Sequence, residues 1–281
     1  YLIFYVEKRL TYNWPDISTF TSPDYKKARY EAQNAVFWLA RGAHSYLDAL
    51  PQNKHLEMEW QSDRETLCTK VFDGDLQIGL SIPELEIFFC ENGEKVRHSF
   101  WFDDRTPAYV EAWYLVELLH RDRDRSKFTI ELPFESKDFF LGDTEEHDAP
   151  AVAVELKAMH DCFIIAADIL SQVQQKLANS GDVVAEIGDI SCKPENFTLR
   201  FEIATKPDDH ANVLVGMSLG DDLRPAPFFF VSKNYAESAK NNHALDFDAA
   251  NLLSLNKMSE QKMDNAAVIN QLLQDAKSCL G

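Results

Sequence analysis

The chain has 281 residues, of which 45% are hydrophobic and 12% aromatic, and its formal net charge is −18. This length and composition suit two domains, or one large domain built from two halves, and they exclude a disordered chain. The acidity is spread over the sequence, since residues 1–150 hold 28 acidic and 17 basic side chains and residues 151–281 hold 18 and 11. A field of this sign repels nucleic-acid phosphates and anionic lipid, so neither is expected as a partner.

The five cysteines are odd in number, lie far apart and include no Cys-x-x-Cys pair. This pattern argues against a disulfide framework or a zinc site and favours reduced thiols in a cytoplasmic protein. No apolar run approaches the roughly 20 residues that a membrane-spanning helix needs. The chain begins at Tyr1 without an initiator methionine, which leaves open whether residues precede it.

A first unit is predicted over residues 24–126, after an apolar hexapeptide and a turn in residues 1–23. Ser22 and Pro23 are typical of a helix start, and apolar residues at steps of three and four predict a helix over about 24–48. Alternating apolar residues then predict an antiparallel meander with turns at Asp73-Gly74 and Asn92-Gly93. The strands of this meander are expected at 56–61, 67–72, 76–80, 84–89 and 96–102, with a helix over 107–119 after them.

A second unit is predicted over residues 127–281, after a mixed-charge segment at 120–127 that suits an exposed linker. Its elements are expected as a strand at 128–132, a polar loop at 142–148, a long amphipathic helix over 152–177, strands at 183–187, 197–204, 213–217 and 228–231, and a helix over 258–278. The repeated order predicts an α+β protein of two similar units, each a small antiparallel sheet with amphipathic helices packed on one face.

Three stretches resemble an uncharacterised bacterial family, a catalogued domain of unknown function with two α+β halves. They are Pro51-Gln-Asn53-Lys-His55, then Ile130-Glu-Leu-Pro133-Phe134 followed by Asp143 and His147, and finally the aromatic strands at 192–203 and 224–231. Usual members have an Asn-His-Trp-Trp stretch after the first helix. Here the tryptophan pair is absent, with only Trp60 nearby, and the histidine-rich part of the later region is Glu195-Asn196-Phe197. The family carries no established activity, so the resemblance implies a fold and no function.

Two polar loops are the candidate binding sites. Asp143, Glu145, Glu146, His147 and Asp148 combine carboxylates with an imidazole, a set that could ligate a divalent cation. The alternative is that their negative charge complements the dipole of the helix that follows. Asp221 and Asp222 could likewise bind a metal or a basic group, and Arg224 a carboxylate or phosphate, unless this loop is only a polar strand connection.

Three further sets have a structural and a functional interpretation. His160-Asp161-Cys162 contains the residue types of a nucleophile relay, but successive helical residues point about 100° apart, which favours a core thiol. His55 and Trp60 join the candidate binding residues because they stand where the family has its Asn-His-Trp-Trp stretch. Aromatic residues could line an apolar pocket or simply form the core. They are Trp60, Phe88, Phe89, Phe100, Trp101, Trp113, Phe228, Phe229 and Phe230.

The sequence contains no GxGxxG, GxxxxGK[ST], HExxH or GxSxG motif, which favours binding over catalysis. The leading interpretation is a cytoplasmic binding or interaction protein with an apolar cleft between sheet and helices, taking a small apolar ligand or a protein. Two alternatives stay open. One is a metal-dependent hydrolase that uses Asp143 and His147 with Asp221 and Asp222. The other is an acidic partner or charge mimic for basic proteins. No cofactor is predicted beyond the divalent metal of the hydrolase alternative.

Overall fold

The computed structural model describes residues 13–136, 146–180, 186–204, 211–235, 247 and 250–280. Its helices are α1 (Ile17–Phe20), α2 (Pro23–Tyr46), α3 (Pro107–His120), α4 (Ala153–Asn179), α5 (Leu255–Glu260) and α6 (Asn265–Leu280), with short 3₁₀ turns η1 (Pro51–Leu56), η2 (Arg125–Lys127) and η3 (Pro150–Val152). Among these helices, none combines the length and the apolarity that crossing a bilayer requires.

The strands belong to one antiparallel sheet, which confirms the α+β class. They are β1 (Met58–Gln61), β2 (Thr66–Cys68), β3 (Leu76–Ser81), β4 (Glu86–Glu91), β5 (Glu94–Lys95), β6 (Phe100–Trp101), β7 (Ser191–Lys193), β8 (Thr198–Ala204), β9 (Ala211–Ser218), β10 (Phe228–Tyr235) and β11 (Asn251–Ser254). Their order is β11-β10-β9-β8-β7-β1-β2-β3-β4-β5, and β6 pairs with β4.

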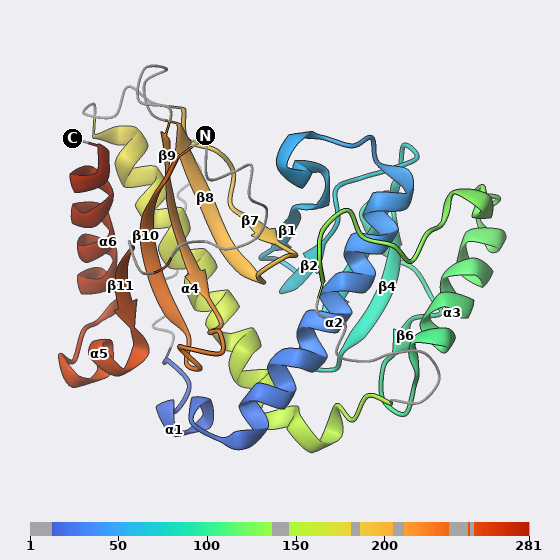
Figure 1. Cartoon of the computed structure of the whole chain (residues 1–281), viewed down its shortest axis with the longest axis horizontal. Coiled ribbons are helices and arrows are strands. Elements are labelled where there is room, and N and C mark those ends of the chain that lie inside the picture. Colours follow the sequence, from blue (N-terminus) through green and yellow to red (C-terminus); the bar gives the residue numbers. More distant parts are fainter. Residues whose placement is uncertain are drawn as a thin grey trace, which may run out of the picture.

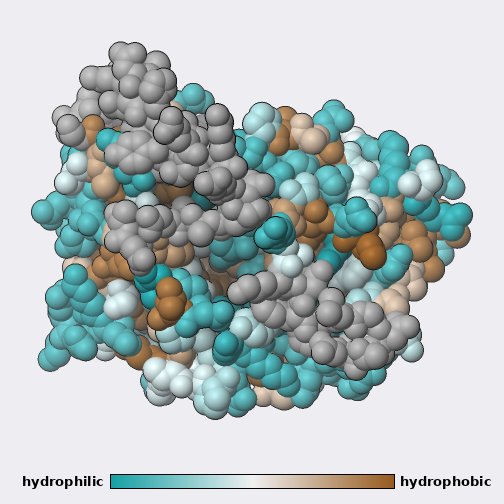
Figure 2. Space-filling view, viewed as in Figure 1, coloured by the Kyte–Doolittle hydropathy of each residue, from teal (hydrophilic) through white to brown (hydrophobic). Residues whose placement is uncertain are grey.

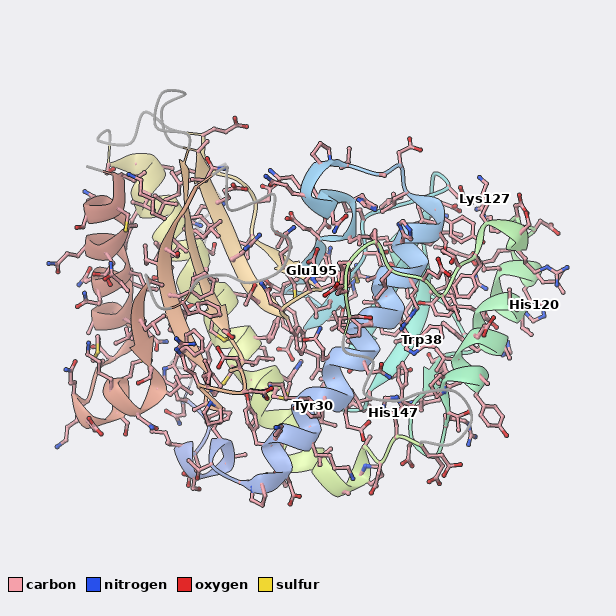
Figure 3. All side chains as sticks on the ribbon, in the orientation of Figure 1. Tyr30, Trp38, His120, Lys127, His147 and Glu195 are labelled. Atoms are coloured by element: carbon pink, nitrogen blue, oxygen red, sulfur yellow. The ribbon has the colours of Figure 1, made fainter. Side chains whose placement is uncertain are left out.

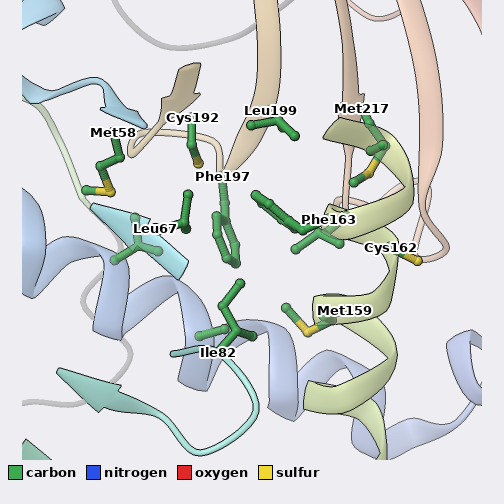
Figure 4. Close-up of a cluster of buried hydrophobic side chains, with 14 of the residues drawn as sticks. Met58, Leu67, Ile82, Met159, Cys162, Phe163, Cys192, Phe197, Leu199 and Met217 are labelled. Atoms are coloured by element: carbon green, nitrogen blue, oxygen red, sulfur yellow. The ribbon is translucent and has the colours of Figure 1, made fainter. Parts of the chain in front are cut away.

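The two sheets expected from the sequence are therefore joined edge to edge. The junction is the antiparallel pair β1·β7, where Met58 lies opposite Cys192 and Glu59 opposite Ser191. Beneath the junction, the rings of Phe163 from α4 and Phe197 from the β7–β8 turn pack with centroids 5.3 Å apart, among methionine, leucine and cysteine side chains (Figure 4). One core thus continues from the first half of the chain into the second.

The long helices cover one face of this sheet. Alternate residues such as Ile78 of β3 and Val215 of β9 share a single buried cluster with the apolar stripes of α2, α4 and α6. In Figure 1, α2 passes in front of β2 and β4, whereas α4 passes behind β8–β10. The two helices lie on the same face of the sheet, but the twist of the sheet turns that face between them. Each strand is rotated by roughly 20–25° relative to its neighbour, so the five steps from β9 to β3 add up to a rotation of roughly 100–125°.

Local signals explain where the helix predicted over about 24–48 begins. The Ser22 hydroxyl caps α2 by accepting from the Asp24 N–H at 3.1 Å, and Pro23 occupies its first turn. Both expected turns are present, with positive φ at Asp73 and Gly74 and at Asn92 and Gly93. Such backbone favours Gly and Asn, which is why these dipeptides could be identified in advance.

The strand predicted over 128–132 is wrong. This segment has no strand partner and runs across the outer side of α2 instead (Figure 1). The Thr129 N–H donates to Ser45 Oγ at 3.0 Å, and Arg41 Nε donates to the Ile130 carbonyl at 2.6 Å. Phe134 then packs against Phe37, so the alternating apolar residues cover a helix rather than pair in a sheet.

The single helix predicted over 258–278 is also wrong, because α5 and α6 replace it. Lys262 adopts a left-handed φ of 48°, and the Asp264 carboxylate accepts from the Ala267 N–H at 2.8 Å, which starts α6 afresh. The strand predicted at 84–89 begins only at Glu86, since Leu85 has a φ of 43°. The apolar hexapeptide at 1–6, residues 142–145 of the polar loop and residues 183–185 lie outside the described chain.

Candidate functional site

His147 lies in a buried polar cluster with two side chains of α2. Its Nδ1 is hydrogen-bonded to the Glu31 carboxylate, and its Nε2 lies 3.0 Å from Asn34 Nδ2. The second Glu31 oxygen accepts from the Asp148 N–H at 3.1 Å. Because the Asn34 amide nitrogen donates to Nε2, the imidazole carries its proton on Nδ1 and donates it to Glu31. All three side chains are essentially excluded from solvent.

His147 has a structural role, because it connects α2 to the segment around residues 102–105. Its carbonyl accepts from the Asp104 N–H at 3.1 Å, its N–H donates to the Arg105 carbonyl at 3.3 Å, and its ring packs on Phe102. Both ring nitrogens are engaged, so a metal ion would have to displace Glu31 or Asn34. The described residues contain no cluster of three or more metal-ligating side chains, and Asp143, the other predicted ligand, lies outside them.

Asp221 and Asp222 face different partners. Asp221 stabilises its own turn, because its carboxylate accepts from the Leu223 and Arg224 N–H groups at 2.8 and 2.6 Å and pairs with the Arg224 guanidinium at 3.1 Å. Asp222 is ion-paired with Arg29 of α2 at 3.2 Å. Partial burial raises the pKa of Asp222, but nearby cationic side chains outweigh it and the net pKa is lowered. The loop therefore docks on α2 through Asp222.

Both predicted loops contact the same helix, α2. The Asp222 carboxylate pairs with Arg29 and lies 3.3 Å from the Tyr30 hydroxyl. His147 is hydrogen-bonded to Glu31, the next residue of α2. Figure 3 shows Tyr30 on the N-terminal half of α2 and His147 near it. His147 and Asp222 are partnered by α2 side chains, which no local pattern in the sequence connects with either loop.

His55 is the most incompletely bonded of the predicted residues. It is 2% exposed, and its Nδ1 accepts from the Leu50 N–H at 3.2 Å, so the proton is on Nε2. That Nε2 has no hydrogen-bond partner among the described residues. Burial lowers the pKa of His55, and the nearby ring of His44, with its centroid 5.8 Å away, lowers it further.

The segment around His55 contacts the β7–β8 turn. Asn53 Nδ2 donates to Glu195 at 3.4 Å, and Lys193 Nζ donates to the Gln52 carbonyl at 2.7 Å. Gln52 and Asn53 both have left-handed backbone, with φ of 56° and 55°. Residues 51–55 and 192–203, which carry the family resemblance, are thus in contact. Lys193 was missed by sequence reasoning, because nothing local distinguishes it from a surface lysine.

Trp60 and the remaining sequence candidates belong to the core or its rim. Trp60 packs on Phe163 and His160, with ring centroids 5.5 and 5.8 Å away. His160 faces Glu65 whereas Asp161 pairs with Lys157, so no relay forms with Cys162, whose thiol pKa burial raises. The other aromatic candidates are buried except for Trp101, which is 53% exposed, and Trp113, which is half-buried.

Cys68 and Cys90 form a polarised thiol pair on the face of the sheet opposite the helices. Interaction with the Cys68 thiol lowers the pKa of Cys90, with a further contribution from Arg64, whose Nη1 lies 3.7 Å from the Cys90 sulfur. The pKa of Cys68 is raised correspondingly. β3 lies between their strands, so the backbones are roughly 9–10 Å apart and a disulfide would require backbone movement.

α3 is apolar on two opposite sides, which sequence reasoning missed. Val110, Tyr114 and Leu118 are buried against the sheet and α2. The other side presents a stripe of exposed apolar residues, which we call the α3 outer face. It consists of Tyr109, Ala112, Val116 and Leu119. Figure 2 shows brown, apolar residues toward the right edge of the molecule, where Figure 1 places α3.

No family model, curated protein or solved structure matches this chain.

Proposed function

We propose that this chain is a non-enzymatic interaction protein that binds its partner through the α3 outer face. We favour the outer apolar surface over the apolar cleft expected between sheet and helices, which stays a prediction, because facing side chains such as Leu39, Ile78 and Phe89 are packed and almost fully buried in the described core. The apolar surface that remains for binding lies on the outside of the molecule.

One observation carries the proposal: α3 exposes an apolar stripe directly opposite the stripe that it buries. Tyr109, Val116 and Leu119 are 58%, 47% and 50% exposed, and Ala112 lies between them. Spacings of three, four and three residues place all four on one side of the helix. Single exposed apolar residues are ordinary, but an ordered stripe of them is typical of an interaction surface. A helix that is apolar all round is expected to be covered on both sides.

The test is binding of Nile red, an uncharged apolar dye, which the net charge of −18 does not repel. Native protein is expected to enhance its fluorescence, and Val116→Glu with Leu119→Glu is expected to abolish most of that enhancement. Val154→Glu is the matched control, because Val154 is 69% exposed at the start of α4 and lies off the α3 outer face. Circular dichroism verifies folding of each variant. Equal enhancement by all three folded proteins would contradict the proposal.

We also infer that the two halves derive from one duplicated unit. In support, both contain a long helix, a meander of strands and a closing helix, and the first meander strands of the two halves, β1 and β7, are the pair at the junction. An experimental structure tests this idea. Cα atoms of α2 to α3 should superpose on those of α4 to α6 in order, and a match that required reordering the strands would contradict it.

A further inference from the structure

We infer that this chain has a second binding site, for a small zwitterion such as a free α-amino acid, between Arg200 of β8 and Glu195 of the β7–β8 turn. The site goes beyond the proposed function and shares no residue with the α3 outer face. The Arg200 guanidinium binds the carboxylate of the ligand, and the Glu195 carboxylate binds its ammonium group. The inference rests on two charged side chains that lie near each other without forming an ion pair.

Arg200 lies on the face of the sheet opposite the helices, because its neighbours Leu199 and Phe201 are part of the buried core. It stands opposite Ser191 of β7 and Gly216 of β9. A Cβ on Gly216 would lie 2.6 Å from Arg200 Cβ, so glycine at this position leaves room for the arginine. Arg200 is half-buried, and desolvation lowers its pKa. The guanidinium is therefore surrounded by protein but keeps some contact with solvent.

Three carboxylates lie near this guanidinium, but within the described ranges none of them forms an ion pair with it. They belong to Glu57, Glu195 and Glu202. Glu57 is paired instead with Lys193 at 3.4 Å, and Glu202 with Lys54 at 3.4 Å. A partly buried charge is costly unless it has a close partner. Arg200 therefore has the capacity to bind the carboxylate of a ligand with two parallel hydrogen bonds.

Glu195 has unused hydrogen-bond acceptors. Its Oε1 receives a contact from Asn53 Nδ2 at 3.4 Å, and its Oε2 is buried without a partner among the residues that the structure describes. A buried oxygen that accepts no hydrogen bond has lost its hydration without compensation. Figure 3 shows Glu195 between the strands of the second half and α2. An ammonium group carries three donors and supplies what this carboxylate lacks.

Arg200 and Glu195 together specify a ligand that carries both charges. A simple anion at Arg200 would be repelled by Glu195, and a simple amine at Glu195 would be repelled by Arg200. An α-amino acid has a carboxylate and an ammonium group on one carbon, so it complements both side chains at once. Because such a ligand has few atoms, we expect a dissociation constant in the micromolar to millimolar range.

The first measurement is thermal unfolding of native protein at pH 7 with each standard α-amino acid at about 10 mM, a concentration that stabilises the folded state if it exceeds the dissociation constant. Sodium acetate and methylammonium chloride, at the same concentration and ionic strength, are the single-charge probes. At least one amino acid is expected to raise the Tm, whereas neither single-charge probe is. No shift with any amino acid overturns the inference, and so does an equal shift with either single-charge probe.

Calorimetric titration with the amino acid that gives the largest shift then tests the position of the site. Arg200→Gln and Glu195→Gln are each expected to weaken binding at least about tenfold. The control Arg97→Gln, at an exposed position between β5 and β6, is expected to leave binding unchanged. Circular dichroism verifies folding, and Glu195→Gln, which keeps the shape of the side chain, decides the outcome if Arg200→Gln does not fold. Native affinity in either folded variant overturns the inference.

Discussion

Glu31 offers the sharpest test of how the described interior is held together. Its carboxylate accepts from His147 Nδ1 and from the Asp148 N–H, and it is fully buried. We consider two substitutions. Glu31→Ala removes both acceptors and leaves a small cavity, whereas Glu31→Gln keeps the shape and one acceptor oxygen but loses the charge and replaces the other oxygen with a donor.

The expected magnitudes follow from these contacts. Leaving a buried donor without its acceptor costs about 1–3 kcal/mol, and Glu31→Ala leaves two such donors, His147 Nδ1–H and the Asp148 N–H, for about 2–6 kcal/mol together. We expect Glu31→Ala to lower the free energy of unfolding by about that amount. A hydrogen bond to a charged group contributes about 1.5–3 kcal/mol, and Glu31→Gln gives up one such bond, so its expected loss falls in that lower range.

The assay is equilibrium urea unfolding at pH 7, followed by both tryptophan fluorescence and circular dichroism so that a two-state transition can be verified. Glu94→Gln, on the exposed strand β5, is the matched control and should change the free energy of unfolding by less than about 0.5 kcal/mol. A Glu31→Gln protein as stable as the native one would refute the reasoning, because it would mean that no charge is needed at this position.

Three further predictions concern single side chains. Gly216→Ala should cost about 1–3 kcal/mol in urea unfolding, because its Cβ would lie 2.7 Å from the backbone oxygen of Leu199; a neutral effect would contradict the close packing of β8 on β9. Alkylation of Cys90, followed by mass spectrometry from pH 6 to 9, should rise with a midpoint below the ordinary thiol value of about 8.5, and Cys68→Ala should move that midpoint upward because it removes the main cause of the lowered pKa; an unmoved midpoint would contradict the thiol pair. Because the pKa of His55 is lowered in the folded protein, the unfolded chain binds the proton more readily and stability should fall as pH drops below about 6.5; a urea midpoint that responds to pH equally in native protein and His55→Gln would argue against this.

The elements that sequence alone could predict are those whose signals are local. α2 and the two hairpin turns carry their caps and turn dipeptides in adjacent residues, so periodicity and capping suffice. The error at 128–132 shows the limit. Alternating apolar residues indicate that one side of an extended segment is buried, but they do not indicate whether it packs on a sheet or on a helix. Residues 128–132 pack on α2.

The candidate site was less predictable because its partners are distant in sequence. His147 was chosen for its acidic neighbours, yet its partner is Glu31, 116 residues away. Nothing near Glu31 separates it from any other helical glutamate. The α3 outer face was overlooked for a different reason. Its apolar residues and those of the buried side merge into one apolar helix in the sequence, and only the fold shows that one side has no cover within the described chain.

The junction between β1 and β7 has a consequence for how the protein is made. It pairs Met58 with Cys192, residues that are 134 positions apart (192 − 58). At a synthesis rate of about 5–20 residues per second, the second strand emerges roughly 7–27 s after the first. During that interval β1 is an open strand edge on a nascent half-sheet, the kind of edge that templates aggregation. Glu57 and Glu59 border Met58 on that edge. Their negative charges oppose pairing of the open edge with another chain before β7 has been synthesised.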